Sequence, residues 1–292
     1  MPIYSLGSIN ADHFYDLPHL PGPGETLAAT GFRTGLGGKG ANQSVAAAKA
    51  GAKVTHIGAV GPEGGWAVDR LRALGVETSG IATLETATGH AIINIDRAGE
   101  NAIVIYPGAN RGLSEAQIRE TLANAGGSDT LILQNETNAQ LEGARIARAK
   151  GMRVVYSAAP FEEAAVRAIL PEISLLILNA VEADQLCTAF GCGLGALPVP
   201  ELLVTKGAEG AEWHALRAGQ TTHMPAFDVK PVDTTGAGDC FAGYFAAGLD
   251  EGLPVEAALR LASAAAALKV TRPGTADAIP DRAEVDGFLR SA

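Results

Sequence analysis

Apolar segments of strand length alternate with alanine-rich helical segments along most of the 292-residue chain. The predicted strands lie at 3–9, 53–60, 130–135, 153–159, 175–179 and 201–205. The predicted helices between them lie at 41–50, 65–74, 139–150 and 162–170. This alternation is typical of a mostly parallel sheet with helices on both faces. We therefore expect an α/β fold in which residues 1–292 form a single three-layer α/β/α domain.

Two segments interrupt the alternation. Residues 11–37 are polar and contain the proline- and glycine-rich sequence LPGPGETL, and residues 87–107 read as a β-hairpin. The second strand of that hairpin carries apolar side chains on both faces, so both faces need cover. One face would close over a ligand and the other would meet a second subunit, or the hairpin would pack on its own domain. We expect these segments to form a small β-sheet lid.

The composition excludes several classes of protein. The formal net charge is −10, and the Lys and Arg residues do not cluster, which argues against a nucleic-acid partner. No run of about 18 apolar residues predicts a membrane span. The N-terminus lacks the pattern of a signal peptide, and the three cysteines fit no zinc or disulfide framework. We therefore expect a cytoplasmic protein with no membrane or nucleic-acid partner.

The sequence TGLGGKGANQS, residues 34–44, matches G-x-G-x-x-G at Gly35, Gly37 and Gly40. A dinucleotide site would require a buried strand directly before it and an acidic residue about 20 positions later. Neither is present. A phosphate-binding P-loop would require an earlier glycine and a hydroxyl residue after the Gly-Lys pair, and both are missing. The stretch therefore does not predict a nicotinamide enzyme or a P-loop enzyme.

The glycines of this stretch would instead let the backbone approach a bound molecule closely. Polar residues stand beside them and after the first predicted strand, where ligands of open α/β sheets bind. The residues are Gly37, Gly38, Lys39, Gly40 and Asn42, together with Asn10 and Asp12. Such a set suits a polyol with several hydroxyls. A helix-start turn with a solvated Lys39, and a capped loop at Asn10 and Asp12, are the alternatives.

The strongest local signal is VDTTGAGDCFAGYFAAGL, residues 232–249. A Gly-Ala-Gly turn opens onto a helix, so free N–H groups from Gly236 to Asp239 gather at a helix N-terminus and form an anion hole. Asp239 stands beside it. A carboxylate there suits a base that deprotonates a hydroxyl attacking phosphorus, although a first-turn acid is also worth about 0.3–1 kcal/mol to the helix alone.

Several sequence blocks together carry a family resemblance. They are GSINAD (7–12), PGET (23–26), GGKGANQ (37–43), GENAIVIYPGAN (99–110), NAVEAD (179–184), TKGAEG (205–210) and DTTGAGDCFAGYF (233–245). With these blocks in this order, the chain resembles the ribokinase family of ATP-dependent sugar kinases over nearly its whole length. The combination of GSINAD and GGKGAN is most similar to the ribokinase branch of that family.

The resemblance implies a role for each matching position. Asp239 is the implied catalytic base, and the N–H groups of Gly236, Ala237 and Gly238 are the implied anion hole for the transferred phosphoryl group. The implied sugar contacts are Asn10, Asp12, Gly38, Lys39, Asn42, Glu136 and Asp239. The implied nucleotide side consists of Asn179 and Glu182 near Mg²⁺ and the phosphates, Thr205, Gly207, Gly210 and Gly238, and Ser263 near the adenine.

The resemblance also implies an activating potassium ion and a homodimer paired through the lid, 11–37 and 87–107. The potassium ligands, mostly backbone oxygens, would come from Asp233, Thr235, Lys269, Arg272, Gly274 and Ala278. Ala278 departs from the family pattern, which has a hydroxyl residue there, so we expect weaker potassium binding. In the sequence SAAP, residues 157–160, Ser157 replaces the asparagine that is usual in the family. The short connection 187–200 predicts that a crossover helix is reduced or absent.

We therefore expect an enzyme that uses ATP and Mg²⁺ to phosphorylate a sugar hydroxyl, converting D-ribose into D-ribose 5-phosphate. Kinases for another sugar or for a nucleoside are the alternatives. A non-catalytic sugar sensor is disfavoured because Asp239 and the anion-hole glycines are intact.

Overall fold

The computed structural model describes residues 1–291, and its main sheet has ten strands. They are β1 (Pro2–Leu6), β4 (Lys53–Val60), β5 (Val76–Glu77), β6 (Ile81–Thr83), β9 (Thr130–Gln134), β10 (Arg153–Ser157), β11 (Leu175–Asn179), β12 (Glu201–Thr205), β13 (Ala211–Ala215) and β14 (Gln220–Met224). Along the sheet, the pairings from β5 to β12 are parallel, as is the pairing of β6 with β4, and the pairings of β12 with β13 and of β13 with β14 are antiparallel. The predicted mostly parallel sheet is confirmed.

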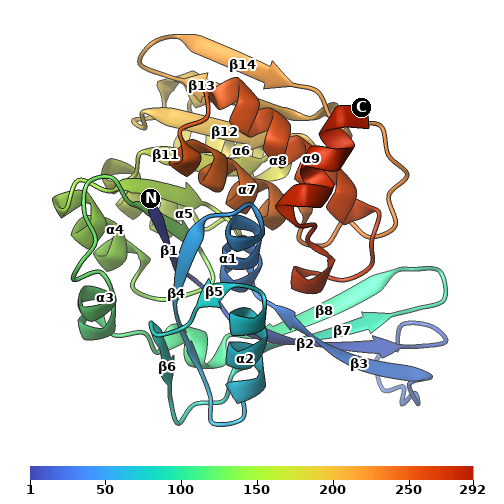
Figure 1. Ribbon diagram of the computed structural model, residues 1–292. Coiled ribbons are helices and arrows are strands. Elements are labelled where there is room, and N and C mark those ends of the chain that lie inside the picture. Colours follow the sequence, from blue (N-terminus) through green and yellow to red (C-terminus); the bar gives the residue numbers. More distant parts are fainter. Residues whose placement is uncertain (292) are drawn as a thin grey trace.

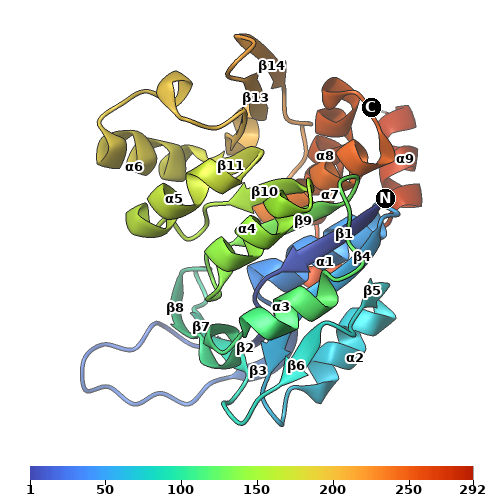
Figure 2. The same ribbon diagram turned by 90° about the vertical axis from the view of Figure 1, so that its left-hand side faces the viewer.

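Helices cover both faces of this sheet (Figures 1 and 2). On one face lie α1 (Lys39–Lys49), α2 (Gly65–Ala73), α7 (Ala237–Glu251), α8 (Val255–Val270) and α9 (Arg282–Ser291), and on the other lie α3 (Glu115–Thr121), α4 (Gln140–Ala149), α5 (Glu163–Ile169) and α6 (Ala180–Phe190). Successive residues of a strand point to opposite faces of the sheet, so Ile132 packs in the core on the first face and Leu131 and Leu133 in the core on the second. The predicted three-layer α/β/α architecture is confirmed.

Short 3₁₀ turns complete the described elements, at Gly108–Arg111, Leu170–Glu172, Leu194–Ala196, Gly207–Glu209 and Ala276–Ala278. Between α6 and β12 lies only the turn Leu194–Ala196, so the expected reduction of the 187–200 connection is confirmed. The crossover from β11 to β12 is made by α6 itself. Within residues 1–291, no helix has the length and apolar character needed to cross a membrane.

A second sheet of four strands projects from the main domain (Figure 1). Its order is β3 (Gly31–Gly37), β2 (Asn10–Asp16), β7 (Gly89–Ile95) and β8 (Asn101–Tyr106). The predicted small second sheet is therefore confirmed. All six residues of β8, an edge strand, are exposed, so the parent domain does not cover it.

The chain leaves the main sheet earlier than predicted. The predicted strand 3–9 ends at Leu6, and Asn10 already begins β2 of the small sheet. Gly7 lies at the break, and its backbone packs so closely on α1 that a Cβ there would lie 2.5 Å from the Cα of Gly40. Asn10 and Asp12 therefore lie on the small sheet and not at the end of a main-sheet strand.

The strand order places a ligand crevice beside β1. The chain runs from β1 to β4 on one side, and β9 to β12 extend from the other side of β1. In open α/β sheets, ligands bind outside the carboxyl ends of the strands where the order changes direction. The segments that follow β1 and β9 carry Asn10, Asp12 and Glu136 to this position.

Candidate active site

Asp239 lies in the first turn of α7 and is held by two side-chain amides from α1. Asn42 Nδ2 donates to Oδ2 and Gln43 Nε2 donates to Oδ1, each at 3.0 Å. The two helices approach closely because Gly243 has no side chain: a Cβ there would lie 2.5 Å from the Cβ of Ala46. The result is a carboxylate that is 8% exposed and fixed in orientation.

The N-terminus of α7 presents fewer free donors than predicted. The Ala237 N–H donates to the carbonyl oxygen of Thr234 at 3.1 Å, so the prediction that Ala237 is an anion-hole donor is wrong. Within residues 1–291, the N–H groups of Gly236 and Gly238 have no such acceptor. A Cβ on Gly238 would meet nothing within 4 Å, so the space beside it is open. These two amides and the helix dipole remain as an anion site.

Several charged side chains come from the residues predicted to contact a sugar. Asp12 is 7% exposed, and burial together with the negative charge of Glu136 raises its pKa to about 7. The negative charge of Asp239, and with it those of Glu136 and Glu182, raises the pKa of Lys39 against the opposing effect of burial. The positive charge of Lys39 thus acts on carboxylates predicted for both the sugar and the phosphates.

Backbone and side-chain hydrogen bonds fix the sugar-side residues. Glu136 Oε2 accepts from Ser8 Oγ at 2.5 Å and from the Lys39 N–H at 3.0 Å. Asn110 Nδ2 donates to Asn10 Oδ1 at 2.8 Å. The Asn110 side chain also accepts from the Ile9 N–H and donates to the Ile9 carbonyl oxygen. The ends of β1, α1 and β9 thus share one polar network.

Sequence reasoning missed the residues that build this network, although some lie in the quoted blocks. Gln43 follows Asn42 in GGKGANQ, and Asn110 ends the block 99–110. Gln134 Nε2 donates to Gln43 Oε1 at 2.7 Å, which orients the amide that faces Asp239. The available signal was their position in those blocks, but spacing alone does not reveal partners about 200 residues away.

The glycine-rich stretch serves a different purpose from the one expected. A Cβ on Gly37 would overlap the carboxylate of Asp12, and a Cβ on Gly40 would lie 2.5 Å from the backbone of Gly7. The interpretation that both glycines leave room for a bound molecule is therefore wrong. They allow close packing between protein segments, which sets the position of Asp12.

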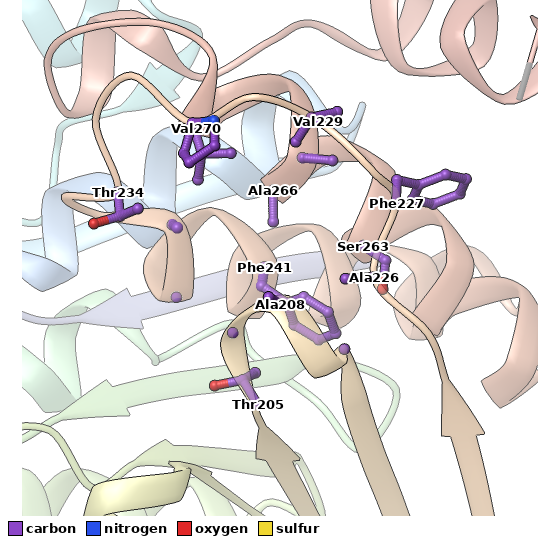
Figure 3. A pocket seen from close by; sticks show the side chains of 16 residues that line it. Thr205, Ala208, Ala226, Phe227, Val229, Thr234, Phe241, Ser263, Ala266 and Val270 are labelled. Carbon is purple, nitrogen blue, oxygen red and sulfur yellow. The ribbon is translucent and has the colours of Figure 1, made fainter.

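A cavity of about 330 Å³ adjoins the anion site (Figure 3). Thr205, Gly207 and Gly210 line it at the end of β12, together with Phe241 of α7 and Ser263 of α8. Its wall also includes Thr234, Ala237 and Gly238. The cavity is mostly apolar, as a flat heterocycle requires, and the buried Ser263 Oγ has no hydrogen-bond partner within residues 1–291.

Asn179 and Glu182 stand apart from this cavity, at the start of α6. They form a capping box: Glu182 N–H donates to Asn179 Oδ1, and Asn179 N–H donates to Glu182 Oε2, each at 2.8 Å. Burial raises the pKa of Glu182, while the Asn179 N–H and Lys39 oppose the shift. The pair caps α6, and the charges of Lys39 and Asp239 act on the Glu182 carboxylate.

The residues fit a magnesium ion held mainly by phosphates. Within residues 1–291, no group of three or more His, Cys, Asp or Glu side chains could hold a metal ion. Mg²⁺ usually binds through one or two carboxylates together with substrate phosphates and water. The carboxylate of Glu182, on whose pKa the charge of Asp239 acts, matches this mode.

The residues predicted for potassium do not fit that ion. Asp233 Oδ1 and Oδ2 accept the N–H groups of Thr235 and Gly274, each at 2.9 Å. Lys269 Nζ donates to the Asp233 carbonyl oxygen, also at 2.9 Å. Burial lowers the pKa of Lys269, and the negative charge of Asp233 opposes that shift. The Arg272 guanidinium pairs with Glu284, and the side chain of Ala278 is a methyl group without an oxygen.

Comparisons with known proteins show the family of this chain. Residues 3–282 match the family described as "pfkB family carbohydrate kinase". The chain is 37% identical to a ribokinase of Haemophilus influenzae, and the match covers 98% of both chains. It is 31% identical to a deoxyribokinase of Salmonella typhi, and that match covers 99% of both chains. The solved structure of Arabidopsis thaliana ribokinase complexed with ribose and ATP superposes with a TM-score of 0.87 at 29% identity, covering 99% of this chain and 98% of that one. The chain therefore belongs to the pfkB family of carbohydrate kinases.

Proposed function

We propose that this protein transfers the γ-phosphoryl group of ATP to the 5-hydroxyl of D-ribose and so forms D-ribose 5-phosphate. The observation that carries the proposal is the Asp239 carboxylate, fixed by Asn42 and Gln43 beside the free amides of Gly236 and Gly238. The ribokinase relatives, and the plant ribokinase complexed with ribose and ATP, support ribose as the acceptor.

The sugar would lie between the small sheet and α1. Asn10, Asp12, Lys39, Asn42 and Glu136 offer donors and acceptors to its hydroxyls, and the backbone of Gly38 lies beside them. The small sheet would act as a lid that excludes water from the reaction. The hydroxyl to be phosphorylated would point at Asp239.

The reaction requires one proton transfer and one displacement. Asp239 accepts the hydroxyl proton while that oxygen forms a bond to the γ-phosphorus, and the bond from phosphorus to ADP breaks. The amides of Gly236 and Gly238 stabilise the negative charge of the transferred group, and Lys39 adds a positive charge. ATP would place its base in the cavity beside Ser263, with Thr205, Gly207 and Gly210 along the nucleotide. Glu182 would hold Mg²⁺, and that ion would supply positive charge to the phosphates.

The exposed edge of the small sheet supports a homodimer. Val104 is 65% exposed and Ile105 58%, on opposite faces of β8. An exposed apolar edge strand favours pairing with another strand or surface. We place the second subunit on this strand. The three cysteines are free thiols, which fits a reducing compartment such as the cytoplasm.

A substrate panel tests the proposal. ATP consumption would be measured with D-ribose, 2-deoxy-D-ribose, fructose, adenosine and inosine, and ribose should give the highest kcat/KM. A tenfold preference for another acceptor would reject ribose and keep the kinase assignment. Tight binding of ribose without any ATP consumption would reject the kinase assignment and favour a sugar sensor.

A further inference from the structure

Lys269 is a fully buried lysine behind the anion site. It lies near the end of α8 and is 0% exposed. Its Nζ donates to the carbonyl oxygen of Asp233 at 2.9 Å. Asp233 begins the turn that leads through Gly236 into α7, so the ammonium group supports the segment that carries the anion-site amides.

The oxygens around this ammonium group already have partners. Both carboxylate oxygens of Asp233 accept backbone N–H groups, and the carbonyl oxygen of Lys269 accepts the Arg272 N–H at 3.0 Å. A protein potassium site must replace much of the hydration shell with oxygens. Ala278 supplies no side-chain oxygen, and a second cation beside the ammonium group would be repelled by it.

We propose that the Lys269 ammonium group is the permanent monovalent cation of this enzyme, so that phosphoryl transfer does not need potassium. It carries the same single charge as potassium and bonds a backbone oxygen that a bound ion would use. Lys269 is a positioning residue: it holds the 233–236 turn and touches neither substrate. The inference rests on the phosphoryl-transfer function proposed above.

The kinetic test replaces potassium chloride with tetramethylammonium chloride at constant ionic strength. The kcat of the wild-type protein should be the same at zero and 100 mM potassium. Lys269→Met should lower kcat by roughly tenfold or more without potassium, because a hydrogen bond to a charged group is lost. Potassium should restore part of that activity, since it can enter the space that the ammonium group leaves.

The second readout is thermal unfolding of the ligand-free protein in the same two salts. Potassium should raise the melting temperature of Lys269→Met and leave the wild type unchanged. Lys150→Met is the matched control, because Lys150 Nζ also donates to a carbonyl oxygen, that of Ala123 at 3.1 Å, far from this site. Lys150→Met should show no potassium effect in either measurement. If no sugar is phosphorylated, the proposed function fails, and the melting experiment still tests the cation.

Three results would overturn the inference. The first is that potassium activates the wild type by more than about threefold. The second is that potassium stabilises the ligand-free wild type. The third is that Lys269→Met has the same kcat as the wild type at zero potassium. Lys269→Ala is the second variant should Lys269→Met fail to fold. If neither variant folds, the wild-type titration decides alone.

Discussion

Gln43 donates its side-chain amide to the carboxylate of Asp239, with Nε2 at 3.0 Å from Oδ1, across the contact between α1 and α7. Gln134 in turn donates to Gln43 Oε1 at 2.7 Å. A relay from β9 through α1 thus sets the orientation of the proposed base. Because this relay touches no substrate, it should affect the chemical step more than sugar binding.

The first prediction concerns this relay. Gln43→Met should lower kcat by roughly 10- to 100-fold, the effect of losing a buried hydrogen bond to a charged group, and leave the KM for ribose within about threefold. Gln117→Met is the control, since the Gln117 side-chain amide donates to the carbonyl oxygens of Gly58 and Gly80 in a partly buried position and makes no bond to Asp239. A kcat of Gln43→Met within twofold of the wild type would show that Asn42 alone orients the base.

The relay also shows what the sequence could and could not predict. Periodicity located the strands at 130–135 and 175–179 because buried parallel strands are continuous apolar runs, and it placed Asp239 at a helix start. It could not show that Gln43 meets Asp239, because 196 residues separate them and only the packing of α1 on α7 joins them.

Two other differences have local causes. The Ala237 N–H is not available to an anion because the turn at Gly236 directs it to the carbonyl oxygen of Thr234. The direction of this N–H depends on backbone angles that composition does not reveal. The sequence predicted Lys269 only as one of the potassium ligands, which are mostly backbone oxygens, and did not predict the position of its side chain. Its direction depends on how α8 packs behind the 233–236 turn.

The second prediction concerns the base itself. Asp239→Asn should lower kcat by about 10²–10⁴-fold, the usual contribution of general-base catalysis, and should leave ADP affinity nearly unchanged. Steady-state kinetics and calorimetry measure the two quantities. Asp250→Asn, near the other end of α7, should keep wild-type kcat. If Asp239→Asn kept more than a tenth of the wild-type kcat, the base would have to be another residue.

The third prediction concerns the subunit contact. Val104→Lys places a charge on the exposed apolar strand β8 and should shift the protein from dimer to monomer, because burying an unpaired charge is unfavourable. Sedimentation velocity at micromolar concentration measures the change. Gln220→Lys, on the exposed edge strand β14 of the main sheet, should remain dimeric. A monomeric wild type would remove the basis of the proposal.

The fourth prediction is a pH dependence set by Asp12. Its pKa is raised from 3.8 to about 7 by burial and by Glu136, so the native state binds more protons than the unfolded state between these two values. The contribution of Asp12 to the free energy of unfolding therefore falls as the pH rises from about 4 to about 7. Ionisation of Asp12 therefore destabilises the native state without sugar, and hydrogen bonds from a bound sugar would offset this destabilisation.

Ribose binding should show the opposite slope. Only the ionised carboxylate can accept hydrogen bonds from two hydroxyls with both oxygens, so bound ribose favours ionised Asp12. With a pKa of about 7 in the free protein, the ribose Kd should rise roughly tenfold from pH 8 to pH 6. Calorimetry without ATP measures this and avoids titration of the nucleotide phosphates. Asp12→Asn should bind more weakly and lose the pH dependence, whereas Asp16→Asn, on the same strand, should keep it. An equal Kd at both pH values in the wild type would mean that Asp12 does not accept from the sugar, and Glu136 would then be the first carboxylate to test in its place.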